Sequence, residues 1–383
     1  MTRTRTVSGI FFKEAMTGGL RGRIGKPIIH LPNSQMKKTE LTTFDWKWAR
    51  NIWTRSMPEL KPKGKNLSEQ LFNVITSGRY RRGRRYQMGN GAFDKESIMK
   101  IQNSISHGKP IEIILPAFPF KFTHPLKTGS VGADMSEIVS LSKLHELCTQ
   151  VKRVYPKGLK ISIIRDGALY ADVFSRSATS AQQYGLDLHR FVKLMGLEDE
   201  ISFLDLRSTL HSQPDFRQKY QQAASVVDEI LKDPKSLRET VQALRGSAAA
   251  NLPTTGIPHG TIERIFSLEE KELNLNEILL KRNIEHRAEN AARDYLILNK
   301  TIELLDLYNR VQPTALRGSA HLGEGKIPLQ LTRKKTQLFP WMGVSVQDSK
   351  GFTVRYSCEV ANNSAYTPVY LKGNSTPLYY KKV

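Results

Sequence analysis

Charged side chains follow two short apolar runs, where strands of an α/β sheet would end. Residues 111–115 are apolar and lead into a stiff proline- and phenylalanine-rich segment that carries Lys121. Residues 159–164 form a second apolar run, which leads into Asp166 and a glycine. Ligands of open α/β sheets bind beyond the carboxyl ends of the strands. We therefore expect Lys121 and Asp166 at the rim of an active site.

A third group of polar residues lies far along the chain, where Arg317, Ser319 and His321 alternate. Alternation in an extended segment places these three side chains on one face. A guanidinium, a hydroxyl and an imidazole on one face suit anion binding or an acid–base step. Lys127 and Asp172 follow Lys121 and Asp166 closely and join the candidates.

Each of these residues, taken singly, also fits a plain structural role. The two lysines then lie in solvent, Asp166 belongs to a β-turn because an Asp-Gly pair favours turns, and Arg317 forms a surface ion pair.

Several familiar catalytic motifs are absent from the sequence. It has no Walker P-loop, no Gly-x-Gly-x-x-Gly after a strand and no Gly-x-Ser-x-Gly. Cys148 and Cys358 are the only cysteines, too few for a disulfide framework or a cysteine-rich zinc site. His145 and Cys148 lie one helical turn apart, but a zinc site needs three or four ligands. We predict no metal site.

The formal net charge of +22 is concentrated in places, most densely over residues 79–85. Such an excess fits polyanions or phosphorylated substrates, or simply a basic surface. No nucleic-acid-binding module accompanies it, so nucleic acid is the less expected ligand. No apolar run approaches the ~18 residues that span a bilayer, and no signal peptide is evident. We expect a cytoplasmic protein that does not bind membranes.

Strands and helices alternate through the middle of the chain. We predict strands over 111–115, 159–164 and 201–206, and helices capped by Asp94 and Ser136 or spanning 179–195. This alternation predicts an α/β fold with a mostly parallel sheet flanked by helices. Residues 214–251 and 276–308 read as helices with a loop between them. Strands are predicted over 326–331, 343–346, 351–360 and 368–371.

These patterns suggest two parts. Residues 1–93 form a basic, irregular segment whose tryptophans, in a short helix over 44–53, pack on the core. Residues 94–383 form the catalytic domain: a Rossmann-like core over 94–210, a helical part over 211–310, and a β-rich part over 311–383 that completes the site.

Together the segments resemble the isocyanide (isonitrile) synthase family, which includes pyoverdine and dityrosine biosynthesis proteins. Order and spacing agree over residues 94 to about 346. The most specific string runs from Leu115 to Lys121. The other matching stretches are 108–111, 134–144, 155–158, 164–167 with Asp172, 317–321, and 340–343 with Trp341.

The resemblance implies a Rossmann-like fold and a reaction that turns the α-amine of an amino acid, often tyrosine or tryptophan, into an isonitrile. The added carbon is expected from C2 of ribulose 5-phosphate. The implied steps are imine formation, enolisation, loss of phosphate, C–C cleavage and decarboxylation, without a metal or organic cofactor. An iron/2-oxoglutarate oxygenase is the expected downstream enzyme.

This reaction suggests a role for each candidate residue. Asp166 and Asp172 would be general bases, and His321 would carry protons near neutral pH. Arg317 would grip a phosphate or carboxylate in a bidentate manner. Lys121 or Lys127 would hold phosphate or shuttle a proton. Three aromatic residues would line a substrate pocket or pack in the core, namely Phe118, Phe120 and Trp341.

The sequence departs from the family pattern beside these positions. Arg165 stands where a serine is usual before Asp-Gly, Met342 follows Trp341 in place of a histidine, and residues 122–125 differ after Lys121. Arg165 would add a cation to the binding site. The departures leave three alternatives open: a different amine substrate, a formamide product as in the dityrosine branch, and a non-catalytic polyanion-binding paralogue.

Overall fold

The structure is a computed structural model that describes residues 38–383, except 56, 89–90, 122–127, 129, 131, 175–177, 250–260, 334–337 and 362. Its centre is a five-stranded parallel sheet with the strand order β4-β3-β2-β5-β6. This sheet confirms the predicted α/β fold. Its strands are β2 (Ile111–Pro116), β3 (Leu159–Arg165), β4 (Ile201–Asp205), β5 (Leu316–Ser319) and β6 (Ile327–Pro328).

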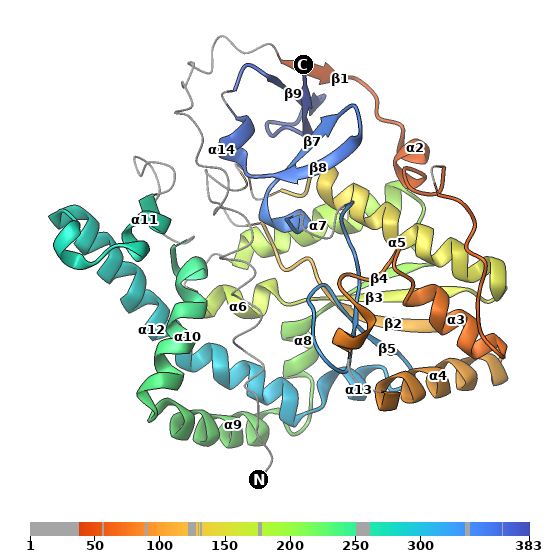
Figure 1. The fold of residues 1–383 in the computed structure, drawn as a ribbon, viewed down its shortest axis with the longest axis horizontal. Helices are drawn as coiled ribbons and strands as arrows, with labels where there is room; N and C mark the ends of the chain where they lie inside the picture. Colours follow the sequence, from red (N-terminus) through yellow and green to blue (C-terminus); the bar gives the residue numbers. More distant parts are fainter. Residues whose placement is uncertain are drawn as a thin grey trace.

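Helices cover both faces of this sheet because successive side chains of a strand point to opposite faces. Ile113 and Ile163 belong to the main core, with α5 (Met135–Val154) and α7 (Ala178–Leu194). Ile114 and Ile164 pack with residues of α8 (Leu206–His211), α13 (Leu307–Val311) and the end of α12. In Figure 1, α5 lies on one side of the strands and α8 and α13 lie on the other.

Two helices begin earlier than the predicted caps. Asp134, not Ser136, caps α5: its carboxylate accepts a hydrogen bond from the Ser136 N–H at 2.6 Å, and Glu137 accepts one from the Asp134 N–H at 2.7 Å. This capping box satisfies N–H groups that have no partner within the helix. Asp94 lies in the first turn of α4 (Gly91–Ser106) and does not cap it.

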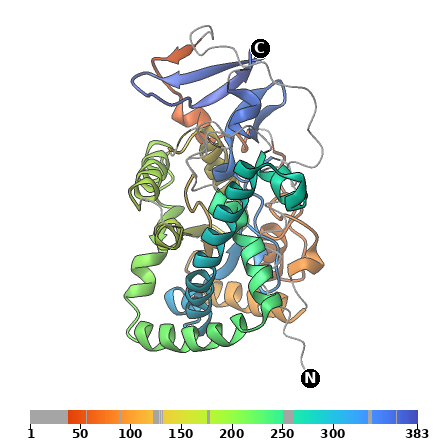
Figure 2. The ribbon, with the colours of Figure 1, turned by 90° about the vertical axis from the view of Figure 1, so that its left-hand side faces the viewer.

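Four helices form the helical arm, which faces the viewer in green and teal in Figure 2. The predicted helix over 214–251 is two helices, because Pro234 lacks an N–H and begins a new one. The long predicted helix ends at Leu304, and Asp306 then adopts a left-handed φ of 44° before α13. The arm consists of α9 (Phe216–Leu231), α10 (Pro234–Ala249), α11 (Thr261–Ser267) and α12 (Leu275–Leu304), with the short η3 (Glu270–Glu272).

A second, mixed sheet has the strand order β1-β9-β10-β7-β8. The predicted strand over 351–360 is wrong in its second half, where residues 357–360 form a helical turn. The predicted strand over 326–331 is short, because only Ile327 and Pro328 pair within the sheet. The elements are β1 (Thr39–Leu41), β7 (Val344–Asp348), β8 (Gly351–Arg355), α14 (Ser357–Val360), β9 (Tyr366–Leu371) and β10 (Tyr379–Lys382).

Residues before α4 wrap around the core. β1 pairs with β9, and Trp53 donates from Nε1 to the Val139 carbonyl of α5 at 2.8 Å. The expected short aromatic helix is α2 (Trp46–Arg50), whereas α3 (Leu67–Ile75) was not predicted. The division at residue 93 falls inside α4 and stays a proposal. Among the described helices, none is long and apolar enough to cross a membrane.

The junction after β3 generates a first prediction. A Cβ at Gly167 would overlap the Pro119 carbonyl oxygen and lie 2.6 Å from the Phe120 ring. Gly167→Ala should therefore lower the free energy of unfolding by about 2 kcal/mol, because the packed segment after β2 must shift. Urea unfolding measures this loss. Gly91→Ala is the matched control, because nothing described lies within 4 Å of its Cβ; an equal loss in both variants would contradict the argument.

Candidate active site

Two candidate residues converge where the parallel strands end. β3 and β5 both pair with β2, one on each side. Asp166 follows β3 directly, at the N-cap of α6 (Gly167–Val173), and Arg317 is the second residue of β5. Because these strands are parallel, their carboxyl ends lie at the same edge of the sheet. The pairing therefore brings Asp166 and Arg317 to that edge from positions 151 residues apart.

Asp166 holds a poorly solvated carboxyl group. Its Oδ1 is buried and has no hydrogen-bond partner among the described residues, and the side chain does not cap α6. Burial raises its pKa to about 6, against an ordinary value of 3.8, while its own backbone N–H opposes the shift. A carboxyl with a pKa near the working pH and a free acceptor oxygen is suited to general base catalysis.

Arg317 packs flat against an aromatic ring. Its Cζ lies 3.3 Å from the ring centroid of Tyr308, on α13. Its Nη1 is buried without a hydrogen-bond partner in the described part of the chain, and burial lowers its pKa. An arginine always stays charged in proteins, so the unpartnered Nη1 favours an anionic ligand.

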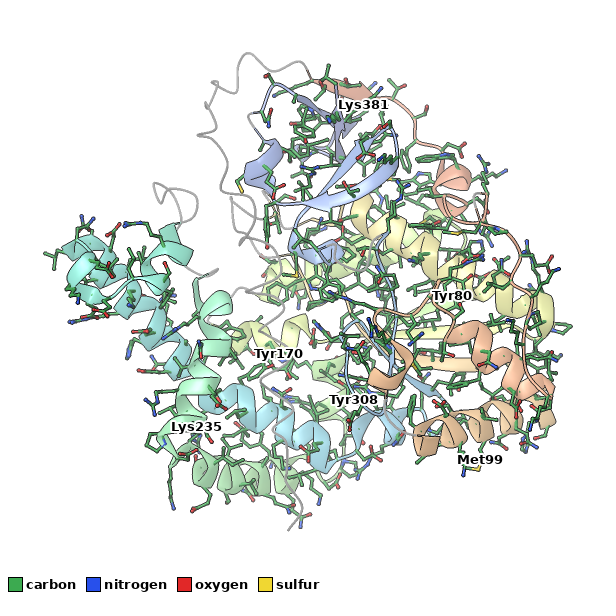
Figure 3. All side chains as sticks on the ribbon, in the orientation of Figure 1. Tyr80, Met99, Tyr170, Lys235, Tyr308 and Lys381 are labelled. Carbon is green, nitrogen blue, oxygen red and sulfur yellow. The ribbon has the colours of Figure 1, made fainter. Side chains whose placement is uncertain are left out.

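Three tyrosines lie near Asp166, and one of them, Tyr308, also contacts Arg317. Burial raises the pKa of Tyr308; Arg317 lowers it and Asp166 raises it, so both charges lie close to this ring. The ring centroids of Tyr170, on α6, and Tyr295, on α12, lie 5.4 Å apart. Burial is the main cause that raises the pKa of both tyrosines, and the charge of Asp166 also raises both. Figure 3 shows Tyr170 and Tyr308 in the central part of the molecule. The helical arm thus contributes an aromatic wall to the site.

A cavity of about 520 Å³ opens beside Arg317 and Tyr308. Its size is that of typical small-ligand sites. The polar lining combines the Arg317 guanidinium with groups that accept hydrogen bonds from hydroxyls, which suits a small anionic polyol. These acceptors come from α4, from the start of α13 and from the turn before β6: Glu96, Asp306, Asn309 and Glu324.

His321 lies in a basic environment near the turn between β5 and β6. Burial, then the charges of Lys326 and Arg82, lower its pKa to about 3, so the imidazole is neutral at pH 7. Burial and the Arg317 charge lower the pKa of Lys326 to about 8. The role of His321 as a proton carrier near neutral pH stays a prediction, which this environment does not favour. A neutral imidazole can still donate or accept one hydrogen bond.

Lys121 lies in a closed ionic cluster and not on a cavity wall. Its Nζ lies 2.7 Å from Asp134 Oδ2 and 3.0 Å from Glu137 Oε2, and its side chain is fully buried. Burial lowers the Lys121 pKa, but the two carboxylates outweigh it and hold the pKa raised, while burial raises the pKa of Glu137. The Tyr184 hydroxyl donates to Glu137 at 3.0 Å. This geometry indicates a positioning role, and catalysis by Lys121 stays a prediction.

The remaining polar candidates are Asp172, Arg165, Ser319 and Lys127. Asp172 is exposed and pairs with Arg207 at 3.2 Å. Arg165 turns toward α7, where its guanidinium occupies the space that a side chain at Gly185 would take. Ser319 is buried, and its hydroxyl accepts the His321 N–H at 3.0 Å, which shapes the turn. Lys127 lies outside the described residues.

The three predicted aromatic residues are buried. Phe118, Phe120 and Trp341 are between 0% and 6% exposed, and all belong to the main core. Phe118 packs edge-on against Trp341 at 5.4 Å and adopts a left-handed φ of 53°, which is rare for a bulky residue. They support the β2 end from within, and a direct role in substrate binding stays a prediction.

Sequence reasoning missed several residues of the site. Tyr308 and Tyr295 lie on helices and carried no motif. Lys326 precedes a short strand, and Arg82 was read only as part of a basic block. In that block, Arg79 pairs with Glu146 at 3.4 Å and Arg81 donates to the Thr76 carbonyl at 3.1 Å, so these two arginines bind their own chain. No group of three or more metal-ligating residues is present among the described residues.

The ionic cluster generates a second prediction. Lys121→Met leaves two buried carboxylates facing one another without a cation, so the free energy of unfolding should fall by about 3–5 kcal/mol. Chemical denaturation measures the loss. Adding Glu137→Gln removes one of the charges and should recover part of it. A stable Lys121→Met protein that is inactive would instead support a catalytic lysine.

The buried carboxyl of Asp166 generates a third prediction. Its pKa is higher in the folded protein than in the unfolded chain, so the folded state binds the proton more tightly. Stability from this group is therefore complete below pH 4 and is lost as the pH rises toward 6. Asp166→Asn removes this loss, and the variant should gain about 3 kcal/mol over the native protein at pH 7 but not at pH 4. Denaturant midpoints at both pH values decide; an equal difference at both would contradict the shifted pKa.

Comparison with known proteins agrees with this fold. The profile of the pyoverdine/dityrosine biosynthesis protein family matches residues 101–367, more than half of the chain. The chain is 27% identical over 259 residues to an L-tryptophan isonitrile synthase of Fischerella ambigua, covering 66% of this chain and 73% of that one. It is 30% identical over 145 residues to an L-tyrosine isonitrile synthase of Xenorhabdus nematophila, covering 38% and 42%.

Among solved structures, the PvcA protein of Pseudomonas aeruginosa has a similar fold. The TM-score is 0.61 at 21% sequence identity, over 83% of this chain and all of that one. The residues that carried the resemblance, from the end of β2 to η4 (Pro340–Met342), lie within the range that the family profile matches. The chain therefore belongs to the pyoverdine/dityrosine biosynthesis protein family.

Proposed function

We propose that this protein is an isonitrile synthase that converts the α-amine of a tyrosine- or tryptophan-like amino acid, with ribulose 5-phosphate as the carbon donor. Two of its relatives are named as isonitrile synthases of L-tryptophan and L-tyrosine. The observation that carries the proposal is the pair of unfilled polar atoms around Tyr308, Oδ1 of Asp166 and Nη1 of Arg317. A base and an anion-binding group beside the same tyrosine suit enolisation of a sugar phosphate.

In this proposal, the ketose phosphate occupies the cavity beside Arg317. Its hydroxyls donate to the acceptors of the lining, such as Glu96 and Asn309, and Arg317 holds a phosphate or carboxylate. The amino acid's amine condenses with the ketone to an imine, with loss of water. Asp166 then removes a proton from the sugar carbon beside the imine, which gives an enaminol. Loss of phosphate and cleavage of both C–C bonds to C2 then leave that carbon on the nitrogen as the isonitrile, without a metal or organic cofactor.

The aromatic side chain of the amino acid is assigned to the wall made by α6 and α12. The ring centroid of Tyr295 lies 5.4 Å from that of Tyr170 and 6.4 Å from that of Phe174. Aromatic rings pack well edge-on or offset at such spacings. This wall, and not Phe118, Phe120 and Trp341, is the better candidate for side-chain selection. An iron/2-oxoglutarate oxygenase is a proposed downstream partner.

The proposal predicts a labelled product. The protein is incubated with a panel of amino acids and ribulose 5-phosphate carrying ¹³C at C2, and the product is read by the isonitrile infrared stretch and by mass. We expect one aromatic amino acid to give an isonitrile that carries the label. The value of kcat/KM should fall below about pH 6, because Asp166 must be ionised to act as a base.

Asp166→Asn should lower turnover by about 10²–10⁴-fold while the protein stays folded. Asp172→Asn is the matched control, because this carboxylate is exposed and pairs with Arg207; its turnover should stay within about twofold. A labelled formamide would assign the protein to the formyl-forming branch. No product from any amino acid, with a folded protein, would refute the proposal.

A further inference from the structure

We propose that Arg82, from the segment before α4, joins Lys326 and Arg317 to form a phosphate-binding site around His321. Arg82 lies outside residues 101–367, the range that the family profile matches. Its place in the site therefore does not follow from the resemblance. The inference rests on the proposed function for its biological ligand, but binding of inorganic phosphate can be tested without turnover.

The segment that carries Arg82 forms backbone hydrogen bonds with β6 and the residues that follow it. The Arg82 N–H donates to the Pro328 carbonyl at 2.7 Å, and the Gln330 N–H donates to the Tyr80 carbonyl at 2.6 Å. Arg81 and Leu329 form an antiparallel bridge. These backbone bonds fix Arg82 beside the strand that follows Lys326. The basic segment is thus a structural part of this site, and not a detached tail.

Arg82 and His321 contact the same phenylalanine. The Cζ of Arg82 lies 4.4 Å from the ring centroid of Phe339, and the His321 ring lies edge-on to the same phenylalanine at 4.8 Å. Phe339 in turn stacks on Trp341 at 4.9 Å with an interplanar angle of 5°. A guanidinium that lies on a ring keeps its N–H groups in plane, where they can bind an oxyanion.

Gly323 leaves room for the side chain of Lys326. A Cβ at Gly323 would overlap Cε of Lys326 and lie 3.0 Å from its Nζ. Gly323 also has a φ of 159°, a conformation that favours glycine. The lysine therefore folds back over the turn, next to Glu324 and Gly325, which line the cavity together with Arg317. A bulkier residue at position 323 would displace the ammonium.

The charged groups near His321 are Arg82, from the segment before α4, and Lys326, from the same turn as His321. The charge of Arg317, on β5, in turn lowers the pKa of Lys326. Glu324 lies on the rim of the cavity and is exposed. Two cations thus lie near a neutral imidazole, and a third, Arg317, lies near one of them, Lys326. Two arginine forks and an ammonium match the oxygens of a phosphate dianion, the group that the proposed co-substrate carries.

The test is binding of inorganic phosphate by isothermal titration calorimetry. We expect Arg82→Gln and Lys326→Gln each to weaken phosphate binding by about 10–100-fold, because each removes a charge-assisted hydrogen bond. Arg82→Lys keeps a charge without the planar fork and should fall between Arg82→Gln and the native protein. Arg84→Gln is the control, since Arg84 is exposed on the same segment; it should bind phosphate as the native protein does.

Near-UV circular dichroism checks that each variant is folded. Equal phosphate binding in the native protein and in folded Arg82→Gln and Lys326→Gln would overturn the inference. In turnover assays, the KM for ribulose 5-phosphate should rise in these variants while the KM for the amino acid stays unchanged. Phosphate binding that depends on Arg82, in a protein that makes no isonitrile, would uphold the anion site and refute the proposed function alone.

Discussion

One buried cation holds together the parts of this protein that build its site. Lys121, at the end of the segment that follows β2, contacts Asp134 and Glu137 at the start of α5. Asp134 also accepts the Ser345 N–H of β7 at 3.4 Å, and Glu137 accepts from Tyr184 of α7. Charges in the interior are tolerated only when they are closely paired and hydrogen-bonded. The cluster therefore ties the β2 end, two helices and the mixed sheet into one arrangement.

This arrangement determines where the strand ends can point. The segment after β2 passes against Gly167, directly behind Asp166, and its strained Phe118 packs under Trp341. With that segment fixed, the Asp166 carboxyl cannot relax toward solvent and keeps a buried, unfilled oxygen. A buried carboxyl without full hydrogen bonding lowers stability, and such strain gathers where function requires it. The ionic cluster around Lys121 is thus the structural support for Asp166, the proposed general base.

The sequence predicted those features that depend on local pattern. The apolar runs of β2, β3 and β4 and the helices between them lie close to the expected positions, because burial on both faces leaves few alternatives for such runs. β5, which carries Arg317, was not among the predicted strands. Asp166 could be expected at the rim of the sheet, because it follows a predicted strand. Tyr308 could not, because α13 follows a left-handed residue, Asp306, that no pattern marks.

Two other residues, Lys121 and Arg82, have positions that depend on contacts between segments far apart in the sequence. Lys121 follows a strand and reads as a rim residue, but the acidic capping box of α5 lies within reach of its side chain. Neither segment alone shows that the two meet. Arg82 sits in a basic run that resembles a solvated surface, and only its backbone bonds to the β6 region give it a place. Sequence patterns predict which side chains are buried. They do not predict which buried charges form ion pairs between distant segments.

The departure at Arg165 shows how the site can diverge without a change in its reactive edge. Arg165 is the last residue of β3, whereas Asp166 already has a helical backbone at the start of α6. Burial lowers the pKa of Arg165, and Asp205 of β4 counters that shift, which places the guanidinium toward β4 and α7. The missing side chain at Gly185 makes room for it. An arginine at 165 and a glycine at 185 therefore form a compensating pair. The added cation is accommodated behind the sheet edge, where it neighbours Tyr184 and the ionic cluster, and Asp166 keeps its own surroundings of tyrosines.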